Sequence, residues 1–195
     1  MINLLDYDTI IVDMDGTLYY QRPVRLVMML MLARRFYRMK DILVVRKYRK
    51  LYAQGLSEED RLARLPETAP RIIRDWMILR PLPFLKKYKD LRLIALLNNC
   101  MEHGKKVLVY SDYPVTEKLQ ALGFHPDAAF SAEDVGCLKP DHTGILQELH
   151  SRHLSLDTCL VIGDRDDKDG QLARNLGCNY LILSASPSIR QKQYF

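Results

Sequence analysis

The sequence predicts an α/β protein: a Rossmann-like parallel sheet covered by helices on both faces, with one all-helical insertion. Three observations predict this class. Short β-branched runs alternate with helical segments from residue 106 onward; the first run, at 7–13, stands far from the second; and the residues between those two runs carry only helical spacing. Parallel strands need such connections, because a tight turn cannot join them.

Five runs are expected to form the strands of the sheet. Each is short, rich in aliphatic or β-branched residues, and bounded by turn residues, as buried strands are. The expected strands are 7–13, 106–110, 128–130, 158–162 and 179–183.

Four helices are expected to pack around these strands. Two of them end at a glycine that can adopt the left-handed conformation, namely 114–122 before Gly123 and 171–176 before Gly177. The other two are 91–103 and 144–153. The polar segment from Ser184 onward is expected to be loosely held.

The insertion is expected to contain helices at 24–39, 41–53, 57–65 and 69–79. Ser57, followed by three acidic residues, is a good helix start, and four prolines between 66 and 83 separate the segments. The expected division is therefore a core domain of residues 1–19 and 86–195 and a helical domain of residues 20–85.

Charge is distributed unevenly along the chain. The 195 residues carry a net charge of +5, yet residues 22–92 hold 19 Lys and Arg against 7 Asp and Glu, so the remainder is acidic. A basic insertion in an acidic core indicates steering of an anionic partner, or no more than a solvated basic surface.

Other global features favour a soluble protein. Hydrophobic residues make up 48% and charged residues 27%. The chain opens without a basic leader, and its longest apolar run, 26–33, falls short of the roughly 20 residues that cross a bilayer. The four cysteines form no Cys-x-x-Cys pair. We expect a cytoplasmic monomer or homodimer without a membrane partner, zinc site or disulfide framework.

Two carboxylates follow the first strand directly, in Asp13-Met14-Asp15-Gly16-Thr17. A turn at Gly16 allows both side chains to reach one crevice at the carboxyl edge of the sheet, where parallel sheets bind ligands. The alternative is an ordinary acidic strand-to-turn boundary, in which Asp and Gly serve only the turn.

Three later segments carry residues that suit phosphate chemistry. Ser111-Asp112 ends the second strand, where a hydroxyl and backbone amides can hold a phosphate oxygen, although Ser-Asp is also an ordinary helix start. Lys139 lies in a loop and would neutralise charge beside carboxylates. The acidic run at 163–170 repels itself unless a cation lies within it, and its hard oxygen ligands fit Mg²⁺.

Taken in order, these four segments resemble the haloacid dehalogenase (HAD)-like hydrolase superfamily over residues 5–20 and 104–183. The resemblance implies a phosphatase that forms an aspartyl-phosphate intermediate. By it, Asp13 is the nucleophile and Asp15 the general acid and base. Lys139 stabilises the nucleophile and the transferring group.

The same resemblance implies the ligand-binding residues. Ser111, with Asp112 and Lys139, holds the phosphate. Mg²⁺ is bound by Asp13, the backbone carbonyl of Asp15, Asp164 and, through water, Asp169. Asp166 and Asp167 are bystanders.

The insertion occupies the place of the helical cap in the resembled family, where caps close over the site and select the substrate. Tyr19 and Tyr20 begin this segment and are expected either to gate the substrate or to pack at the hinge. The presence of Asp15 argues against dehalogenation, because a halide leaves without needing a proton.

The leading interpretation is a Mg²⁺-dependent phosphomonoesterase acting on a small phosphorylated metabolite, with no specific nucleic acid as a partner. A phosphomutase or phosphotransferase shares every catalytic residue and stays open. An alternative from another class is a nucleic-acid-binding protein that uses the basic insert, although no recognised binding motif accompanies the charge.

Overall fold

A five-stranded sheet in the order β3-β2-β1-β4-β5 forms the centre of the computed structural model, which describes residues 2–34 and 38–194. Every neighbouring pair of its strands is parallel, which confirms the predicted fold class. The strands are β1 Thr9–Val12, β2 Lys106–Ser111, β3 Ala128–Ser131, β4 Cys159–Gly163 and β5 Asn179–Ile182.

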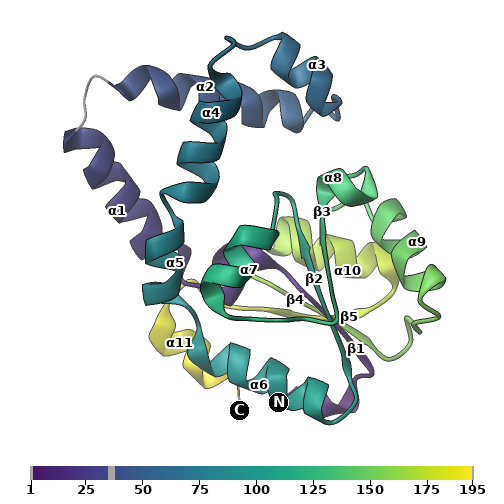
Figure 1. The fold of residues 1–195 in the computed structure, drawn as a ribbon. Helices are drawn as coiled ribbons and strands as arrows, with labels where there is room; N and C mark the ends of the chain where they lie inside the picture. Colours follow the sequence, from purple (N-terminus) through teal and green to yellow (C-terminus); the bar gives the residue numbers. More distant parts are fainter. Residues whose placement is uncertain (1, 35–37, 195) are drawn as a thin grey trace.

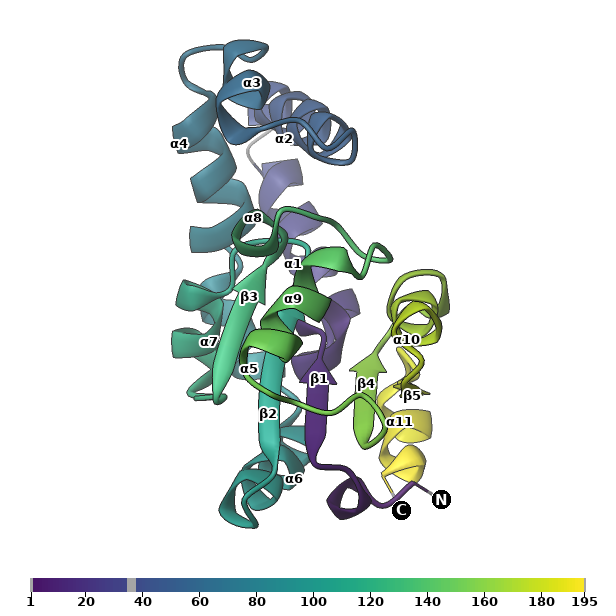
Figure 2. The same ribbon diagram turned by 90° about the vertical axis from the view of Figure 1, so that its right-hand side faces the viewer.

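Each face of the sheet has its own apolar cluster, because successive strand residues point to opposite sides. Ile10 and Val12 pack with α6 (Leu91–Glu102) and α7 (Thr116–Leu122) on one face. Ile11, between them, packs with α9 (Thr143–Ser151) and α10 (Gln171–Leu176) on the other. Figures 1 and 2 show the sheet between these two layers.

The predicted ends of two core helices at Gly123 and Gly177 are confirmed. Gly123 and Gly177 follow α7 and α10 in the left-handed region, with φ of 65° and 74°. Asp90 caps α6 by accepting a hydrogen bond from the backbone N–H of Leu93 at 3.1 Å. The single-turn helix α8 (Ala132–Val135) was not predicted, since four residues are too few to show a period.

The prediction of a loosely held segment after Ser184 was wrong. Residues Pro187–Gln193 form α11, and its Arg190 is only 1% exposed. The Arg190 guanidinium donates to the backbone carbonyls of Gly16 at 2.6 Å and Thr17 at 3.1 Å. This segment is therefore fastened to the turn that follows β1.

Helices α1 Gln21–Arg34, α2 Met39–Tyr52, α3 Glu58–Ala63, α4 Ala69–Arg74 and α5 Leu82–Tyr88 occupy the insertion, with a wide helical turn, η4 (Asp75–Leu79), after α4. Of the helix expected at 24–39, residues up to Arg34 belong to α1, Met39 begins α2, and residues 35–37 lie outside the described part. Helix α5 was not predicted from the sequence. Its first turn contains Pro83, and the first turn of a helix tolerates proline.

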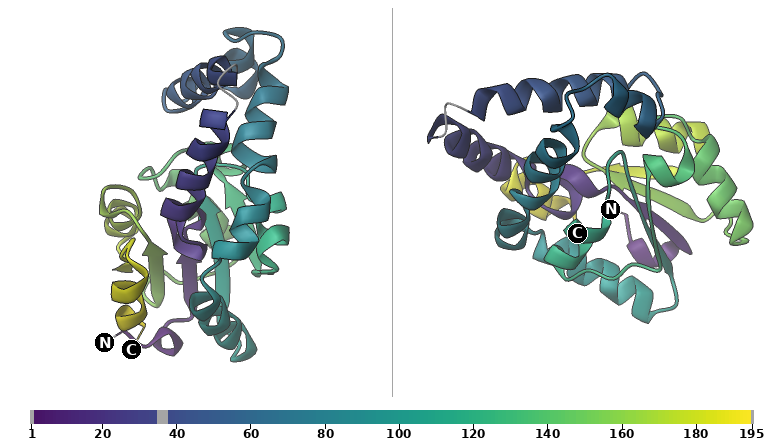
Figure 3. Two further views of the ribbon diagram at one scale, coloured as in Figure 1. Left: turned by 90° about the vertical axis from the view of Figure 1, so that its left-hand side faces the viewer. Right: turned by 45° about the horizontal axis from the view of Figure 1, so that its top comes forward.

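The insertion lies over the carboxyl ends of the strands (Figures 2 and 3). Among the contacts that join it to the core there, Arg61 pairs with Glu133 at 2.6 Å, and the Tyr52 and Tyr113 ring centroids lie 5.5 Å apart. Over the described ranges, every helix is too short or too polar to span a membrane.

Candidate functional site

The turn Met14–Leu18 places two aspartates at the carboxyl end of β1. Gly16 has a φ of +106°, which L side chains rarely adopt. A Cβ at Gly16 would also lie 2.1 Å from the Oδ2 atom of Asp164. Glycine is therefore required here both for the turn and for the approach of the Asp164 carboxylate.

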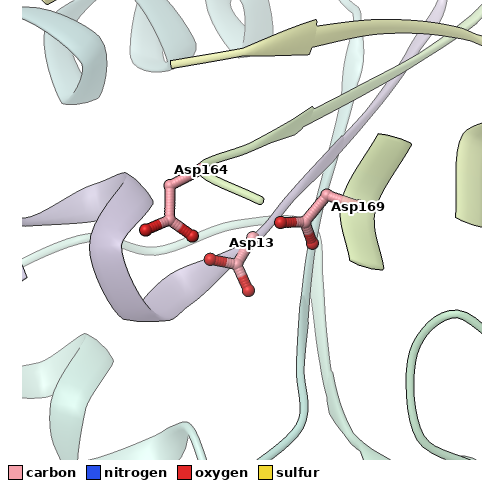
Figure 4. Close-up of side chains that lie close together, drawn as sticks. All are labelled: Asp13, Asp164 and Asp169. Carbon is pink, nitrogen blue, oxygen red and sulfur yellow. The ribbon is translucent and has the colours of Figure 1, made fainter. Parts of the chain in front are cut away.

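Three acidic side chains meet in one cluster: Asp13 follows β1, Asp164 follows β4, and Asp169 lies in the helical turn Asp166–Gly170. Asp13, Asp164 and Asp169 each offer a carboxylate oxygen, and these atoms all lie within 4.8 Å of one another (Figure 4). A Cβ on Gly163 would lie 2.2 Å from the Asp169 carboxylate carbon, so this residue also has to be small. The predicted grouping of the three aspartates is what the structure contains.

Lys139 is the cation of this cluster. It is 5% exposed, and its Nζ donates to Asp13, to Asp169 at 2.7 Å and to the carbonyl of Tyr110 at 3.3 Å. Lys139 pairs with Asp13 and Asp169, so that the three carboxylates of the cluster exceed the charge of this ammonium by two when all are ionised. Bringing like charges together in a poorly hydrated place is unfavourable unless a further cation joins them.

The pKa directions reflect this crowding. Burial raises the pKa of Asp13 to about 7, with repulsion from Asp169 adding to it and Lys139 opposing it. Burial and Asp169 also raise the pKa of Asp164. Burial alone would lower the pKa of Lys139, but Asp13 and Asp169 outweigh it and hold it above its usual value.

The donor set fits a hard divalent cation. Its side-chain oxygen atoms belong to carboxylates, the ligand type of Mg²⁺, and the two-charge excess equals the charge of such an ion. Asp13 and Asp164 would hold it directly. Asp169, which Lys139 and the Arg165 backbone N–H (3.2 Å) already bind, would support it from further out.

Asp15 lies in a separate polar arrangement. Its carboxylate accepts two hydrogen bonds from Lys118, at 2.6 and 2.8 Å, and one from the Tyr19 hydroxyl. Burial would raise the pKa of Asp15, but Lys118 and Tyr19 outweigh burial and lower it. Lys118, which was not among the predicted site residues, therefore holds the Asp15 carboxylate in its ionised form.

A sequence signal for Lys118 does exist. Val115, Leu119 and Leu122 are buried on one side of α7, and Lys118 falls on the same side at helical spacing. A lysine among apolar residues on the covered side of a helix indicates a buried partner of opposite charge. Lys118 is indeed 5% exposed.

Ser111 and Asp112 lie at the end of β2, as predicted. Ser111 is fully buried, and its hydroxyl accepts a hydrogen bond from the Tyr113 backbone N–H at 3.3 Å. The Asp112 carboxylate accepts from the Lys139 backbone N–H at 3.1 Å and from the Lys168 side chain. Asp112 therefore anchors the lysine-bearing loop, and a carboxylate already used in this way is poorly suited to hold phosphate itself.

The two tyrosines that begin the insertion face different surroundings. Tyr19 is buried, lines the cavity between the aspartates and the insertion, and donates a hydrogen bond to Asp15. Tyr20 is outside that cavity lining, and its ring lies 5.0 Å from the guanidinium of Arg190. Thr17, to which the sequence analysis assigned no role, donates to Asp13 at 2.9 Å and orients it.

A cavity of about 520 Å³ joins the site to the insertion. Its core side carries the residues described above, and its other side is formed by α1, α2 and η4. The predicted catalytic, phosphate-binding and metal-binding residues all line this one cavity: Asp13, Asp15, Ser111, Asp112, Lys139, Asp164 and Asp169.

The raised pKa of Asp13 predicts how stability depends on pH without divalent ions. The folded state keeps the proton up to about pH 7, whereas the unfolded state loses it near 3.8, so wild-type stability from this group falls as pH rises between those values. The amide in the Asp13→Asn variant cannot titrate. The stability of Asp13→Asn relative to wild type should therefore increase by about 2 kcal/mol from pH 5 to pH 7 and then level off.

Urea unfolding of both proteins in EDTA at several pH values measures this difference. Because each other titratable group is present in both proteins, its contribution cancels to first order. A stability difference that stays constant from pH 5 to pH 8 would contradict the burial of an uncharged Asp13.

Comparison with known proteins gives a family match over most of the chain. The model of the haloacid dehalogenase-like hydrolases matches residues 7–177. A curated relative from Thermoplasma acidophilum, a "probable D-glycero-D-manno-heptose-1,7-bisphosphate 7-phosphatase", is 28% identical over 138 residues, which cover 57% of this chain and 86% of the relative.

Solved structures of low sequence identity share the fold. The magnesium-bound HAD-hydrolase YfnB from Bacillus subtilis is 14% identical with a TM-score of 0.62, over 91% of this chain and 88% of that one. CbbY from Rhodobacter sphaeroides, in complex with xylulose-(1,5)bisphosphate, is 16% identical with a TM-score of 0.61, over 96% and 90%. At these identities the likeness concerns the fold alone.

Proposed function

The chain belongs to the haloacid dehalogenase-like hydrolases, and from this premise we propose that it is a Mg²⁺-dependent phosphomonoesterase with Asp13 as nucleophile. The observation that carries the proposal is the convergence of a buried nucleophile candidate, a second carboxylate, a lysine and two further acidic residues on one cavity. The phosphatase name of the Thermoplasma relative supports the same reaction class.

In the first step, a carboxylate oxygen of Asp13 attacks the phosphorus atom, and the bond from phosphorus to the ester oxygen breaks. The electron pair stays on the leaving oxygen, which takes a proton from Asp15. Thr17 and Lys139 hold the attacking carboxylate by hydrogen bonds to its two oxygens. This fixes the nucleophile in one orientation before the substrate arrives.

In the second step, water attacks the phosphorus of the aspartyl-phosphate and gives its proton to Asp15. Phosphate leaves and the Asp13 carboxylate is restored. Lys139 and the buried Ser111, which both line the cavity, would offset charge on the phosphoryl oxygens. Mg²⁺ bound at Asp13 and Asp164 would neutralise the same oxygens and lower the repulsion that a carboxylate nucleophile meets.

Asp15 has to acquire a proton before it can act as an acid, although Lys118 holds it ionised in the absence of ligand. An incoming phosphate competes for the Lys118 ammonium and adds negative charge beside Asp15, and both effects favour protonation. We propose Lys118 as a positioning residue for Asp15. Residues 20–85 would act as a cap that covers the cavity and selects the substrate.

Magnesium is expected to stabilise the folded protein as well as to support turnover. At a concentration of Mg²⁺ about 100 times its dissociation constant, binding stabilises by about 2.7 kcal/mol, which for a chain of this length raises Tm by about 5–10 °C. Thermal unfolding with EDTA or Mg²⁺ measures the shift, and phosphate release from an aryl phosphate measures turnover in the same samples.

Two isosteric variants make this test specific. Asp164→Asn removes a proposed ligand and should abolish both the Tm shift and the activation by Mg²⁺. Asp167→Asn alters an exposed residue paired with Arg165 and should keep both. Equal Tm shifts in the two variants would place the ion elsewhere, and turnover that is undiminished in EDTA would refute the dependence on Mg²⁺.

A further inference from the structure

The cavity above the catalytic residues has two chemically different walls. The core wall is ionic, with Asp13, Asp15, Lys118, Lys139 and Lys168 among its members. The wall formed by the insertion is largely apolar and includes Met28, Met29 and Leu32 of α1, Ile42 and Val45 of α2, and Trp76 of η4. Apart from the rings of Tyr19 and Tyr113, the core residues opposite these apolar side chains are mainly charged.

This wall is the open side of a cluster that packs inside the insertion. Val45 and Trp76 are buried in that cluster, and Met28, Leu32 and Ile42 pack against it while remaining half-buried. Met29 is 60% exposed. Contiguous apolar surface that is left open beside a reaction centre indicates a ligand with apolar surface of its own.

The arginines on the insertion wall suit a different ligand, one with a second negative charge. The size of each contribution to affinity decides between that ligand and an apolar one. Arg25, Arg46 and Arg49 line the cavity but are exposed, and an exposed ion pair changes affinity by no more than about fivefold. Each methylene group moved from water to an apolar surface changes affinity by about fourfold. Four methylenes, together about 250-fold, therefore outweigh all three arginine contacts, together about 125-fold.

A highly hydroxylated substrate fits this wall poorly. Its hydroxyl groups would lose water against methionine, leucine and tryptophan side chains without gaining hydrogen-bond partners, and such unpaired groups weaken binding. Methionine side chains also adapt to ligands of varied shape.

We propose that the substrate is a phosphate monoester of an apolar alcohol, whose alkyl or aryl group lies on the wall formed by α1, α2 and η4. This rests on the proposed function: the phosphate group occupies the acidic and lysine side of the cavity, and hydrolysis yields the free alcohol and phosphate. The reaction steps at Asp13 and Asp15 are unchanged.

A series of unbranched alkyl phosphates tests the proposal with the wild-type protein. We expect kcat/KM to rise about two- to fourfold per methylene from ethyl to octyl phosphate, and octyl phosphate to exceed glucose 6-phosphate and fructose 1,6-bisphosphate. A flat or falling series overturns the proposal. A preference for fructose 1,6-bisphosphate overturns it in favour of a second-phosphate site at the exposed arginines.

A pair of neighbouring variants provides the structural control. Met29 lines the cavity and Leu30 does not, yet both are exposed, at 60% and 57%, so glutamine at either position should affect folding equally. Met29→Gln should lower kcat/KM for octyl phosphate about fivefold and leave ethyl phosphate within about twofold. Leu30→Gln should leave both unchanged; equal effects of the two substitutions would count against the assigned wall.

Failure of this inference can be told from failure of the proposed function. If Asp13→Asn abolishes phosphate release but chain length has no effect, only the substrate class is wrong. If no phosphate ester is hydrolysed in an Asp13-dependent manner, the phosphatase proposal itself is wrong.

Discussion

Replacing Asp13 by asparagine is expected to lower Mg²⁺-dependent phosphate release from an aryl phosphate by about 10⁴-fold or more. The amide cannot attack phosphorus, and it removes one ligand of the proposed cation. The side chain keeps its size, so the hydrogen bond from Thr17 and the packing at the end of β1 can persist. Steady-state phosphate release measures kcat, and rapid quenching with a labelled substrate measures the phosphoenzyme.

The matched control is Asp167→Asn, the same chemical change in the same acidic loop at an exposed residue. Its activity should stay within about twofold of wild type. Thermal unfolding of Asp13→Asn should remain cooperative, which separates lost chemistry from lost folding. Near-normal turnover in Asp13→Asn, or a labelled phosphoenzyme still present in it, would reject Asp13 as the nucleophile.

The sequence located the acidic site because its residues lie directly at the ends of recognisable strands. Asp13 follows β1, Ser111 ends β2 and Asp164 follows β4, and the carboxyl ends of parallel strands share one edge. Strand periodicity and adjacent turn glycines are local signals. Once the sheet is predicted as parallel, the gathering of these residues follows from topology alone.

Other parts of the site depend on contacts between distant segments, and the sequence carries weaker signals for them. Lys118 pairs with Asp15 across 103 positions, and Arg190 reaches Gly16 across 174. Lys118 lies among apolar residues on one side of α7, which is a weak signal of burial, whereas Arg190 lies in a short helix whose polarity resembles that of an exposed segment. For Arg190, only the packing of α11 against the core determines that the cation is buried.

Arg190 gives the segment after β5 a role in the geometry of the site. Its guanidinium bonds two carbonyls of the Met14–Leu18 turn and lies near Asp90, the residue that caps α6. The Asp164 carboxylate lies close to Gly16 of this turn, and Arg190 hydrogen-bonds two of the turn's carbonyls. A polar composition predicted exposure, but the hydrogen bonds of Arg190 to backbone carbonyls, and those of Gln193 to the Ile182 carbonyl and Tyr194 to Asp90, fasten the segment to the core.

Replacing Lys139 by methionine is expected to have the largest effect on stability. Methionine fills similar volume but leaves Asp13 and Asp169 buried without their cation, a loss of about 3–5 kcal/mol in EDTA at pH 8, where carboxylates are most ionised. Mg²⁺ should restore part of this loss, because it neutralises the same carboxylates. Activity should fall by about 10²–10³-fold even with Mg²⁺, since charge on the phosphoryl group is no longer offset.

Lys105→Met is the matched control, because Lys105 also pairs with an aspartate, at 2.8 Å, but that partner, Asp8, is 66% exposed at its side chain. Water replaces the lost partner there, so stability and activity should both be retained. Urea unfolding with and without Mg²⁺ compares the two variants. Similar losses of stability in both variants would mean that the ion pairs of Lys139 are solvated like a surface pair. The interpretation of Asp13 and Asp169 as crowded, buried carboxylates, on which the proposed metal site and nucleophile depend, would then be wrong.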